Sequence, residues 1–593
     1  MTLLAGVYSR HVGDRVPDDL CDRIQRALSR NPDELTHHFR DERCFLVKAD
    51  IGAYGEPALR IDPGAVSFLV GEPLLAHSEP TRRSRADDLG ELHVGLSRND
   101  FEALERARGV FCAAHYQPGS GTLTLVTDKL GLRPMYYCLG DRYVIFATAL
   151  RILEEVREVP KVMNLRAVTE IYTLEYALGD RTPFASVGLL KSAEILRVDG
   201  EVSSRRKYWR WDDIQTSDRP LSELTEDAYT NFADAIAVRS GTDSTTAAFL
   251  SGGLDSRSIV MALVQRGLDV HTFNFSFTGT QDQVFGADFA RRVGTTHTER
   301  PRKHGRQVSA SFMADTWMAS NNGTIHQAER PSIIWSGDGG SVTLGHVYLT
   351  LAMVDRAREG DAEAALRLYA KRWAGEIPRR LLTPEMRETV SDLVHNGLLQ
   401  ELSELRCPDA GRALHLVLML NDQRRHLAEH FESIDLNRLE FHLPFFDSEF
   451  VASVLRVPIE SCLGHRLYMQ WLRHFPEVVM SVPWQAYPGH EPCPLPIPSD
   501  LTYQWEESEA RKSRDAHRHN LLRQADQMLS ASDFPDTLLR RHYLRLAAWV
   551  YRLRVRDVGH VIGAAHMYYR YWSQSGGKYL GAVPIGSGDA RGR

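Results

Sequence analysis

The chain has 593 residues, too many for one hydrophobic core, so two or three domains are expected. Hydrophobic residues make up 43% and charged residues 25% of the chain, as in ordinary globular proteins, and the small formal net charge of -6 argues against a dedicated nucleic-acid binder. The seven scattered cysteines form no C-x-x-C pair, which excludes a disulfide framework or zinc site and favours a reducing compartment. Without a signal-peptide pattern or a long apolar run, we expect a cytoplasmic protein that binds neither membranes nor nucleic acid.

Residues 1–205 are predicted to form a β-rich first domain. Short apolar runs such as Thr122–Thr127 and Arg142–Ala147 are separated by turn signals, for example Pro118-Gly119. The charged stretch Ser203–Lys207 and the polar segment Asp212–Asp218 mark the end of this domain.

A second domain is predicted over residues 220–500, and it begins with alternating helices and strands. Apolar spacing indicates helix, strand, helix, strand and helix in turn over Leu224–Ile236, Ala247–Leu250, Ser256–Arg266, Val270–Phe277 and Val284–Val293. A strand, a glycine turn, a helix and a strand make a βαβ unit, which predicts a parallel sheet. Residues 355–475 are mostly helical in pattern, and the proline-rich stretch 484–500 is predicted to be an extended loop.

Residues 501–593 are predicted to form a helical extension that packs on the second domain. Arginine and aromatic residues alternate irregularly over Arg540–Trp572. An amphipathic helix packed on the core is the simplest interpretation, nucleic-acid binding is disfavoured by the overall charge, and a surface for a peptide substrate is a third interpretation.

The central chemical motif is Ser251-Gly252-Gly253-Leu254-Asp255-Ser256, which lies between a predicted strand and a predicted helix. Glycines let the backbone approach an anion closely, the serine hydroxyls can donate to phosphate oxygens, and the helix start presents free N–H groups. Asp255 would be repelled by phosphate directly and is therefore predicted to bind Mg²⁺. A simple glycine turn with a capping side chain is the alternative, but the strand–loop–helix context favours a phosphate loop.

This motif resembles the loop of the N-type ATP pyrophosphatases, and further motifs resemble the asparagine synthetase family over residues 220–480. They are the strand Val270–Phe277, the helix pattern from Asp282 to His297, the second glycine loop Ser336-Gly337-Asp338-Gly339-Gly340 and Leu443-Pro444-Phe445-Phe446-Asp447. The resemblance implies that ATP and Mg²⁺ bind at these loops and that a carboxylate is activated as an acyl-adenylate. It also implies that Leu250, Ser276 and Gly337 border the adenosine.

The front of the chain resembles the class II glutamine amidotransferase domains. The carrying motifs are Thr127–Tyr136, with Gly131, Arg133 and Pro134, and the segment from Gly109 to Ala113. The expected fold is therefore an Ntn-type αββα sandwich, a glutaminase-like domain, followed by a parallel-sheet ATP-pyrophosphatase domain with a helical extension. A working glutaminase of this class needs an N-terminal cysteine as nucleophile, whereas this chain begins Met1-Thr2, so we expect an inactive glutaminase.

Three relatives lack that cysteine or ignore it: the β-lactam synthetases, the carbapenam synthetases and the lasso-peptide macrolactam cyclases. Ser341 stands where the family's second loop has a metal-binding Asp, and Asp338 stands where the β-lactam enzymes have a Tyr. The stretch 481–490, which matches the region of their catalytic lysine, contains no lysine. The chain therefore most resembles a lasso-peptide cyclase, with a precursor peptide as substrate and a leader peptidase and a leader-binding protein as further partners.

The remaining candidate site residues are acids. Asp338 is either a second ligand of Mg²⁺ or an acid–base group. Glu429, or in its place Glu432, is a candidate catalytic carboxylate, although a solvated helix face explains both as well. A β-lactam-type synthetase and an asparagine synthetase that uses free ammonia remain alternative functions.

Overall fold

The computed structural model describes residues 3–75, 84–303, 331–503 and 506–581. The first domain consists of two six-stranded antiparallel sheets that face each other. The first sheet has the order β11-β8-β9-β1-β3-β2 and comprises β1 (Leu3–Ser9), β2 (Thr36–Arg40), β3 (Cys44–Ala49), β8 (Tyr136–Leu139), β9 (Tyr143–Ala147) and β11 (Gly188–Leu189). The second has the order β13-β12-β7-β6-β5-β4 and comprises β4 (Leu59–Asp62), β5 (Ala65–Gly71), β6 (Phe111–Gln117), β7 (Thr122–Thr127), β12 (Glu194–Asp199) and β13 (Val202–Lys207).

Side-chain alternation along the strands produces a four-layer αββα sandwich, so the fold predicted for this half is confirmed. Leu4 and Tyr8 of β1 point between the sheets with Phe68 of β5, whereas Leu3 and Val7 point to the opposite face. The outer face of the first sheet is covered by α1 (Asp18–Leu28), α4 (Leu150–Glu154) and α5 (Leu165–Leu174), and that of the second by α2 (Arg85–Arg98) and α3 (Glu102–Arg106).

A buried lysine lies inside this sandwich. Lys48 on β3 is 0% exposed, and its ammonium is 2.9 Å from Asp50, which also pairs with Arg85 at 2.9 Å. Burial lowers the pKa of Lys48 to about 8. Burial alone would raise the pKa of Asp50, but the charges of Lys48 and Arg85 hold it at about 2.

The stability of the sandwich should therefore depend on pH through Lys48. Between pH 8 and the ordinary lysine value of 10.5, the unfolded chain binds this proton and the folded chain does not, so stability rises with pH across this window. Subtracting the free energy of unfolding of Lys48→Met from that of the wild type should isolate this rise. A difference that stays flat from pH 8 to pH 10.5 would contradict the assignment.

The second domain is built on a five-stranded sheet in which every neighbouring pair is parallel, as the βαβ pattern predicts. Its order is β16-β15-β14-β17-β18, with β14 (Thr245–Phe249), β15 (Asp269–Asn274), β16 (Thr296–Glu299), β17 (Ile333–Trp335) and β18 (Glu440–His442). One face packs on a large apolar cluster from α6 (Leu221–Ser240), α7 (Leu254–Gln265), α8 (Gln281–Val293), α18 (Ser448–Leu455) and α20 (Arg466–Leu472).

Two sequence expectations for this domain need correction. The strand predicted over Val270–Phe277 ends at Asn274, because the Asn274 side chain accepts a hydrogen bond from Ser276 N at 2.9 Å and turns the chain. The family-like pattern from Asp282 to His297 is helical only as far as Val293, the end that the apolar spacing predicts, where Gly294 adopts a φ of 79°. His297 instead lies on β16 and contacts Thr272 Oγ1 at 2.8 Å.

Helices fill the middle of the chain, and several of them share an apolar cluster with Leu174, Tyr176 and Leu178 of the first domain. They are α10 (Gly340–Thr343), α11 (Leu351–Arg358), α12 (Ala362–Trp373), α13 (Pro384–Val390), α14 (Leu393–Ser403), α15 (Ala410–His426), α16 (Ala428–Glu432), α17 (Ile434–Asn437) and α19 (Ile459–Cys462). Three helices follow the proline-rich loop: α21 (Glu507–Ser530), α22 (Arg541–Arg552) and α23 (Gly559–Gln574). Within the described ranges, each helix is too short or too polar to span a bilayer.

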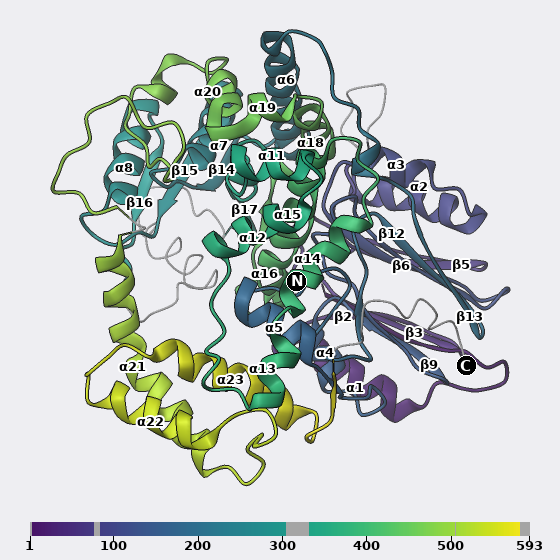
Figure 1. Ribbon diagram of the computed structural model, residues 1–593. Coiled ribbons are helices and arrows are strands. Elements are labelled where there is room, and N and C mark those ends of the chain that lie inside the picture. Colours follow the sequence, from purple (N-terminus) through teal and green to yellow (C-terminus); the bar gives the residue numbers. More distant parts are fainter. Residues whose placement is uncertain (1–2, 76–83, 304–330, 504–505, 582–593) are drawn as a thin grey trace.

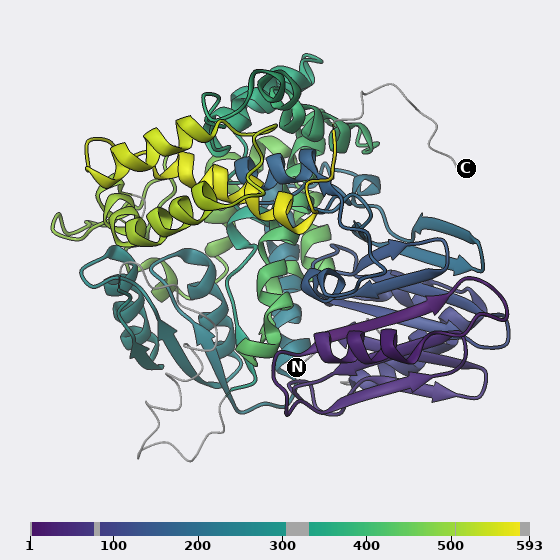
Figure 2. The same ribbon diagram turned by 90° about the horizontal axis from the view of Figure 1, so that it is seen from below.

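The C-terminal helices contact the first domain as well as the second. Figures 1 and 2 show them in yellow at one end of the molecule, beside the blue segment that contains α5. Tyr568 of α23 is 3.0 Å from Thr169 of α5, and the short strand β19 (Tyr579–Leu580) pairs with β10 (Met163–Asn164). Apolar side chains of α13 join the same cluster. The predicted packing on the second domain therefore accounts for only part of this interface.

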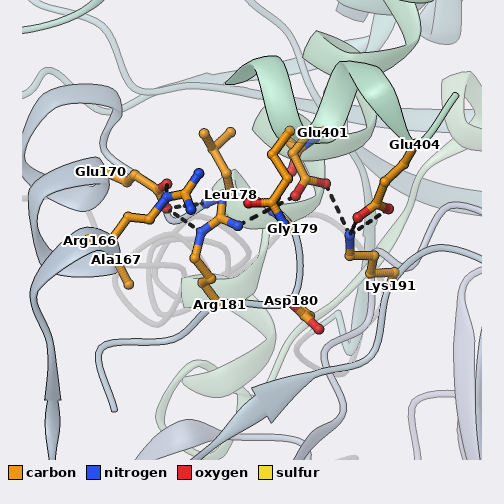
Figure 3. Close-up of polar contacts among 12 residues, drawn as sticks. Arg166, Ala167, Glu170, Leu178, Gly179, Asp180, Arg181, Lys191, Glu401 and Glu404 are labelled. Atoms are coloured by element: carbon orange, nitrogen blue, oxygen red, sulfur yellow. Dashed lines mark hydrogen bonds and ion pairs between the residues drawn. The ribbon is translucent and has the colours of Figure 1, made fainter. Parts of the chain in front are cut away.

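A chain of alternating charges joins the two domains (Figure 3). Glu170 on α5 is fully buried and accepts from Arg181 at 2.9 Å. Arg181 also lies 3.6 Å from Glu401 on α14, which in turn lies 3.3 Å from Lys191, and Lys191 contacts Glu404 at 2.7 Å. Glu170 and Arg181 pair within the first domain. Glu401 and Glu404 of the second domain pair with Arg181 and Lys191 of the first, and these contacts join the two domains.

Candidate active site

The first glycine loop leaves the carboxyl end of β14, a central strand of the parallel sheet, and leads into α7. Crevices at this end of such sheets are the usual ligand sites. Ser251 N donates to Ser256 Oγ at 2.9 Å, and the two hydroxyls lie 3.1 Å apart, so the loop closes on itself. Gly253 precedes α7, and no side chain caps the helix. The first N–H groups of α7 are therefore available to an anion.

Three side chains outside the motif hold the loop in this shape. Gly252 N donates to Asp282 Oδ1 at 2.7 Å, and Gln485 Nε2 donates to the same oxygen at 3.1 Å. Asn274 Nδ2 donates to Leu250 O at 2.9 Å. A Cβ on Gly252 would lie 2.8 Å from the backbone of residues 281 and 282, so only glycine fits here. Sequence patterns alone assigned none of these side chains a role in the site.

The second glycine loop follows β17 and packs directly against the first. A Cβ on Gly337 would lie 2.9 Å from Ser256 N, and one on Gly340 would lie 2.6 Å from the Asp255 carboxylate. Gly339 adopts a φ of 92°. These glycines allow a contact between the loops that no larger residue would permit.

The Asp255 carboxylate lies at this contact and accepts hydrogen bonds at both oxygens. Ser341 donates to Oδ2 from its backbone N at 3.1 Å and its hydroxyl at 2.7 Å, and Tyr468 OH donates to Oδ1 at 2.6 Å. Burial raises the pKa of Asp255, and the charge of Asp338 raises it further. Ser341 thus orients Asp255, where an acid at position 341 would repel it.

Asp338 lies close to Asp255 and is held by Ser336 Oγ, which donates to Asp338 Oδ2 at 2.5 Å. No cluster of three or more metal-binding side chains occurs among the described residues. Two carboxylates nevertheless fit Mg²⁺, which keeps several waters and takes its other ligands from substrate phosphates. The structure therefore brings both predicted metal ligands together, and it leaves the acid–base role of Asp338 open.

The segment after α20 is fixed against the loops by a buried arginine. Arg257 on α7 is 0% exposed, and its guanidinium donates to the carbonyls of Val479, Val482 and Pro483 at 2.7–2.9 Å. This contact positions Gln485 beside Asp282. Tyr487 follows, and burial together with the charge of Asp255 raises the pKa of its hydroxyl.

The residues predicted to border the adenosine lie beside the first loop, whereas the candidate catalytic glutamates do not. Leu250 and Ser276 are buried at the carboxyl ends of β14 and β15, beside the first loop. Glu432 is turned away from the loops, because it accepts from Tyr136 OH at 2.7 Å and Leu150 N at 2.9 Å in the first domain. Glu429 is exposed on α16, and within the described part of the chain its side chain forms no hydrogen bond or ion pair with either loop. Its catalytic role stays a prediction.

Comparisons with known proteins match two separate segments of the chain. Residues 83–209 match the glutamine amidotransferase domain family, and residues 228–312 match the asparagine synthase family. A putative glutamine-hydrolysing asparagine synthetase 2 of Methanocaldococcus jannaschii is 27% identical over 192 residues, which are 31% of this chain and 37% of that protein. The glutamine-hydrolysing asparagine synthetase 3 of Bacillus subtilis is 22% identical over 256 residues, 40% of this chain and 41% of that protein.

These matches span about two fifths of the length of those relatives. Among solved structures, the glutamine phosphoribosylpyrophosphate amidotransferase from B. subtilis aligns with a TM-score of 0.24 and 9% identity over 57% of this chain and 77% of that one, a similarity too weak to carry an argument. The resemblance to the asparagine synthetase family is confirmed by the matched domains, and the finer resemblance to lasso-peptide cyclases is untested by them. Met1 and Thr2 lie outside the described residues.

Proposed function

Because the chain carries the two domains of the asparagine synthetase family, we propose that it is an ATP-dependent amide-forming ligase. The observation that carries the proposal is the contact of the two glycine loops at Asp255. In the proposed reaction a substrate carboxylate attacks the α-phosphate of ATP and pyrophosphate leaves. An amine then attacks the acyl-adenylate, which forms the amide and releases AMP.

Each part of the site has a place in this reaction. The N–H groups at the start of α7 and the hydroxyls of Ser251 and Ser256 would bind the phosphates. Leu250, Ser276 and Gly337 would border the adenosine. Asp255 and Asp338 would hold Mg²⁺, which neutralises charge on the phosphates when bound. Asp282 and Gln485 keep the first loop in shape and touch none of the reacting atoms.

Within this class, a macrolactam cyclase is the function we favour. Its substrate would be a precursor peptide whose Asp or Glu side chain is adenylated and then attacked by the peptide's own N-terminal amine. Ring closure needs the two ends to be held together more than it needs a strong catalytic group. Position 338 carries no tyrosine and 481–490 carries no lysine, which disfavours β-lactam formation. A leader peptidase would supply the free amine, and a leader-binding protein would deliver the peptide.

Pyrophosphate release with a panel of substrates tests this proposal. A leader-free peptide with a free N-terminus and an acidic residue at the ring position should release pyrophosphate and yield a product lighter by one water. The same peptide with its N-terminus acetylated should still be adenylated without closing. The peptide with Asn or Gln in place of the acid should release none.

Other results of this assay would assign a different function to the protein. Release with a small amino-acid derivative and none with peptides would favour a β-lactam-type synthetase. Asparagine formed from aspartate and ammonia would favour an asparagine synthetase, and glutamate released from glutamine would identify a working glutaminase domain. Absence of pyrophosphate release with all of these substrates would contradict the amide-ligase proposal itself.

A further inference from the structure

A basic groove lies between α21 and the end of α22, in the part of the chain that the proposed ATP site does not use. The groove has a volume of about 670 Å³ and is lined by Arg518, Arg523, Arg552 and Arg554, with Asp526 as its one acidic side chain. Arg552 pairs with Asp526 at 2.8 Å. Arg518 pairs with Asp515 at 2.7 Å, and the charge of Asp515 also acts on Arg554. Arg523 forms no ion pair among the described residues, so the four arginines outnumber these two acids and the groove keeps a net positive charge.

The sequence around this groove carries charge of the opposite sign to the rest of the chain. Residues 507–580 contain thirteen Lys and Arg side chains against seven Asp and Glu side chains, whereas the whole chain has a formal net charge of -6. Basic residues are thus concentrated in the C-terminal helices. Such a concentration attracts and orients acidic ligands over distances of about 10 Å at moderate salt.

The outward face of α22 adds exposed apolar side chains beside the groove. Leu544, Ala547, Ala548 and Tyr551 form the buried face of this helix. The opposite face carries Leu546, Trp549 and Leu553, which are 53%, 56% and 53% exposed. Val555 follows at 72% exposed. Helix α22 lies at the edge of the molecule, so this face is open to solvent within the described structure (Figure 1).

Arg552 connects these two features. Arg552 follows Trp549 by three positions, and side chains at this spacing lie next to each other on a helix. Because Arg552 lines the groove, a ligand bound there can continue onto Trp549 without crossing the buried face of α22. An exposed tryptophan next to arginine is the composition that dominates binding energy at peptide and protein interfaces.

We propose that this groove and the outward face of α22 form a docking surface for an acidic segment of the peptide substrate, outside the ring, that carries large apolar side chains. The proposal rests on the proposed function, since it assigns a second anchoring site to the same peptide. Arginines would pair with the acidic side chains, and Trp549 and Leu553 would cover the apolar ones. Exposed aliphatic side chains distinguish this surface from a nucleic-acid site, where aromatic stacking and phosphate contacts dominate.

Binding of labelled peptides to the full-length protein without ATP tests this surface. The probes are an acidic peptide containing leucine and phenylalanine, the same peptide with lysines for its acids, the same peptide with alanines for its apolar residues, and a single-stranded RNA. Fluorescence anisotropy at low salt should show tightest binding to the first probe and weakening as salt rises. Arg523→Glu and Trp549→Ser should each weaken it by about tenfold or more.

Matched controls are exposed side chains on α11. Arg356→Glu and Leu351→Ser change side chains that are 56% and 57% exposed and should leave binding unchanged. Equal binding of the lysine peptide or of RNA, or no binding of the acidic peptide, would overturn the proposal. Pyrophosphate release with free core peptides is measured in parallel. Suppose that pyrophosphate release persists in Arg523→Glu while neither the wild type nor any variant binds the acidic peptide. The docking surface is then wrong and the amide-ligase proposal stands.

Discussion

Asp255→Asn is expected to lower ATP-dependent pyrophosphate release at least about 100-fold, because the position then lacks the charge that we propose binds Mg²⁺. The wild-type carboxylate accepts from Ser341 at one oxygen and from Tyr468 at the other. An asparagine offers only one acceptor oxygen, so its amide group must face one of these donors. Pyrophosphate release measured across a magnesium titration checks the result.

Stability and a matched variant separate this effect from unfolding. Burial and the nearby Asp338 raise the pKa of Asp255, which means that the charged form is disfavoured in the folded protein. Asp255→Asn should therefore leave the unfolding temperature unchanged or raise it. Ser341→Ala keeps the charge of Asp255 and removes one hydroxyl donor, so it should lower pyrophosphate release by about tenfold or less. Turnover at wild-type level in Asp255→Asn would contradict the metal assignment.

The layout of the second domain could be predicted from the sequence because its signals are local. A strand, a glycine-rich turn and a helix are adjacent in the chain, so periodicity and glycine placement were sufficient to locate β14, the loop and α7. The same signals predicted the parallel sheet, whereas the second glycine loop was identified only by its resemblance to the asparagine synthetase family. Strand ends were less predictable, because Asn274 ends β15 through a side-chain turn inside an apolar run.

The hydrogen bonds that hold the two loops in place could not be predicted, because they join residues far apart in the chain. Gln485 reaches Asp282 across 203 positions, and Tyr468 reaches Asp255 across 213. No spacing rule connects such pairs. For the same reason Glu432, three positions after Glu429, was considered for catalysis although it contacts Tyr136 of the first domain.

Arg133 is a motif residue whose ion-pair partner could not be predicted from the sequence. Arg133 belongs to the amidotransferase-like motif of the first domain, yet it pairs with Glu440 on β18 of the second domain at 2.5 Å. Their exposed fractions are 2% and 0%, and Arg133 also lies 4.4 Å from the Phe431 ring. The motif therefore contributes to the domain interface.

Glu440→Ala is expected to destabilise the protein by about 3–5 kcal/mol, because it leaves the Arg133 charge buried and unpaired. Replacing both residues together, Arg133→Met with Glu440→Leu, removes the charge as well and should recover most of that loss. Scanning calorimetry is the suitable measurement, since two domains can unfold in separate transitions. Glu363→Ala, which breaks an exposed ion pair with Arg367 on α12, should change little. If the double variant were as unstable as Glu440→Ala, lost packing and not the unpaired charge would be the cause.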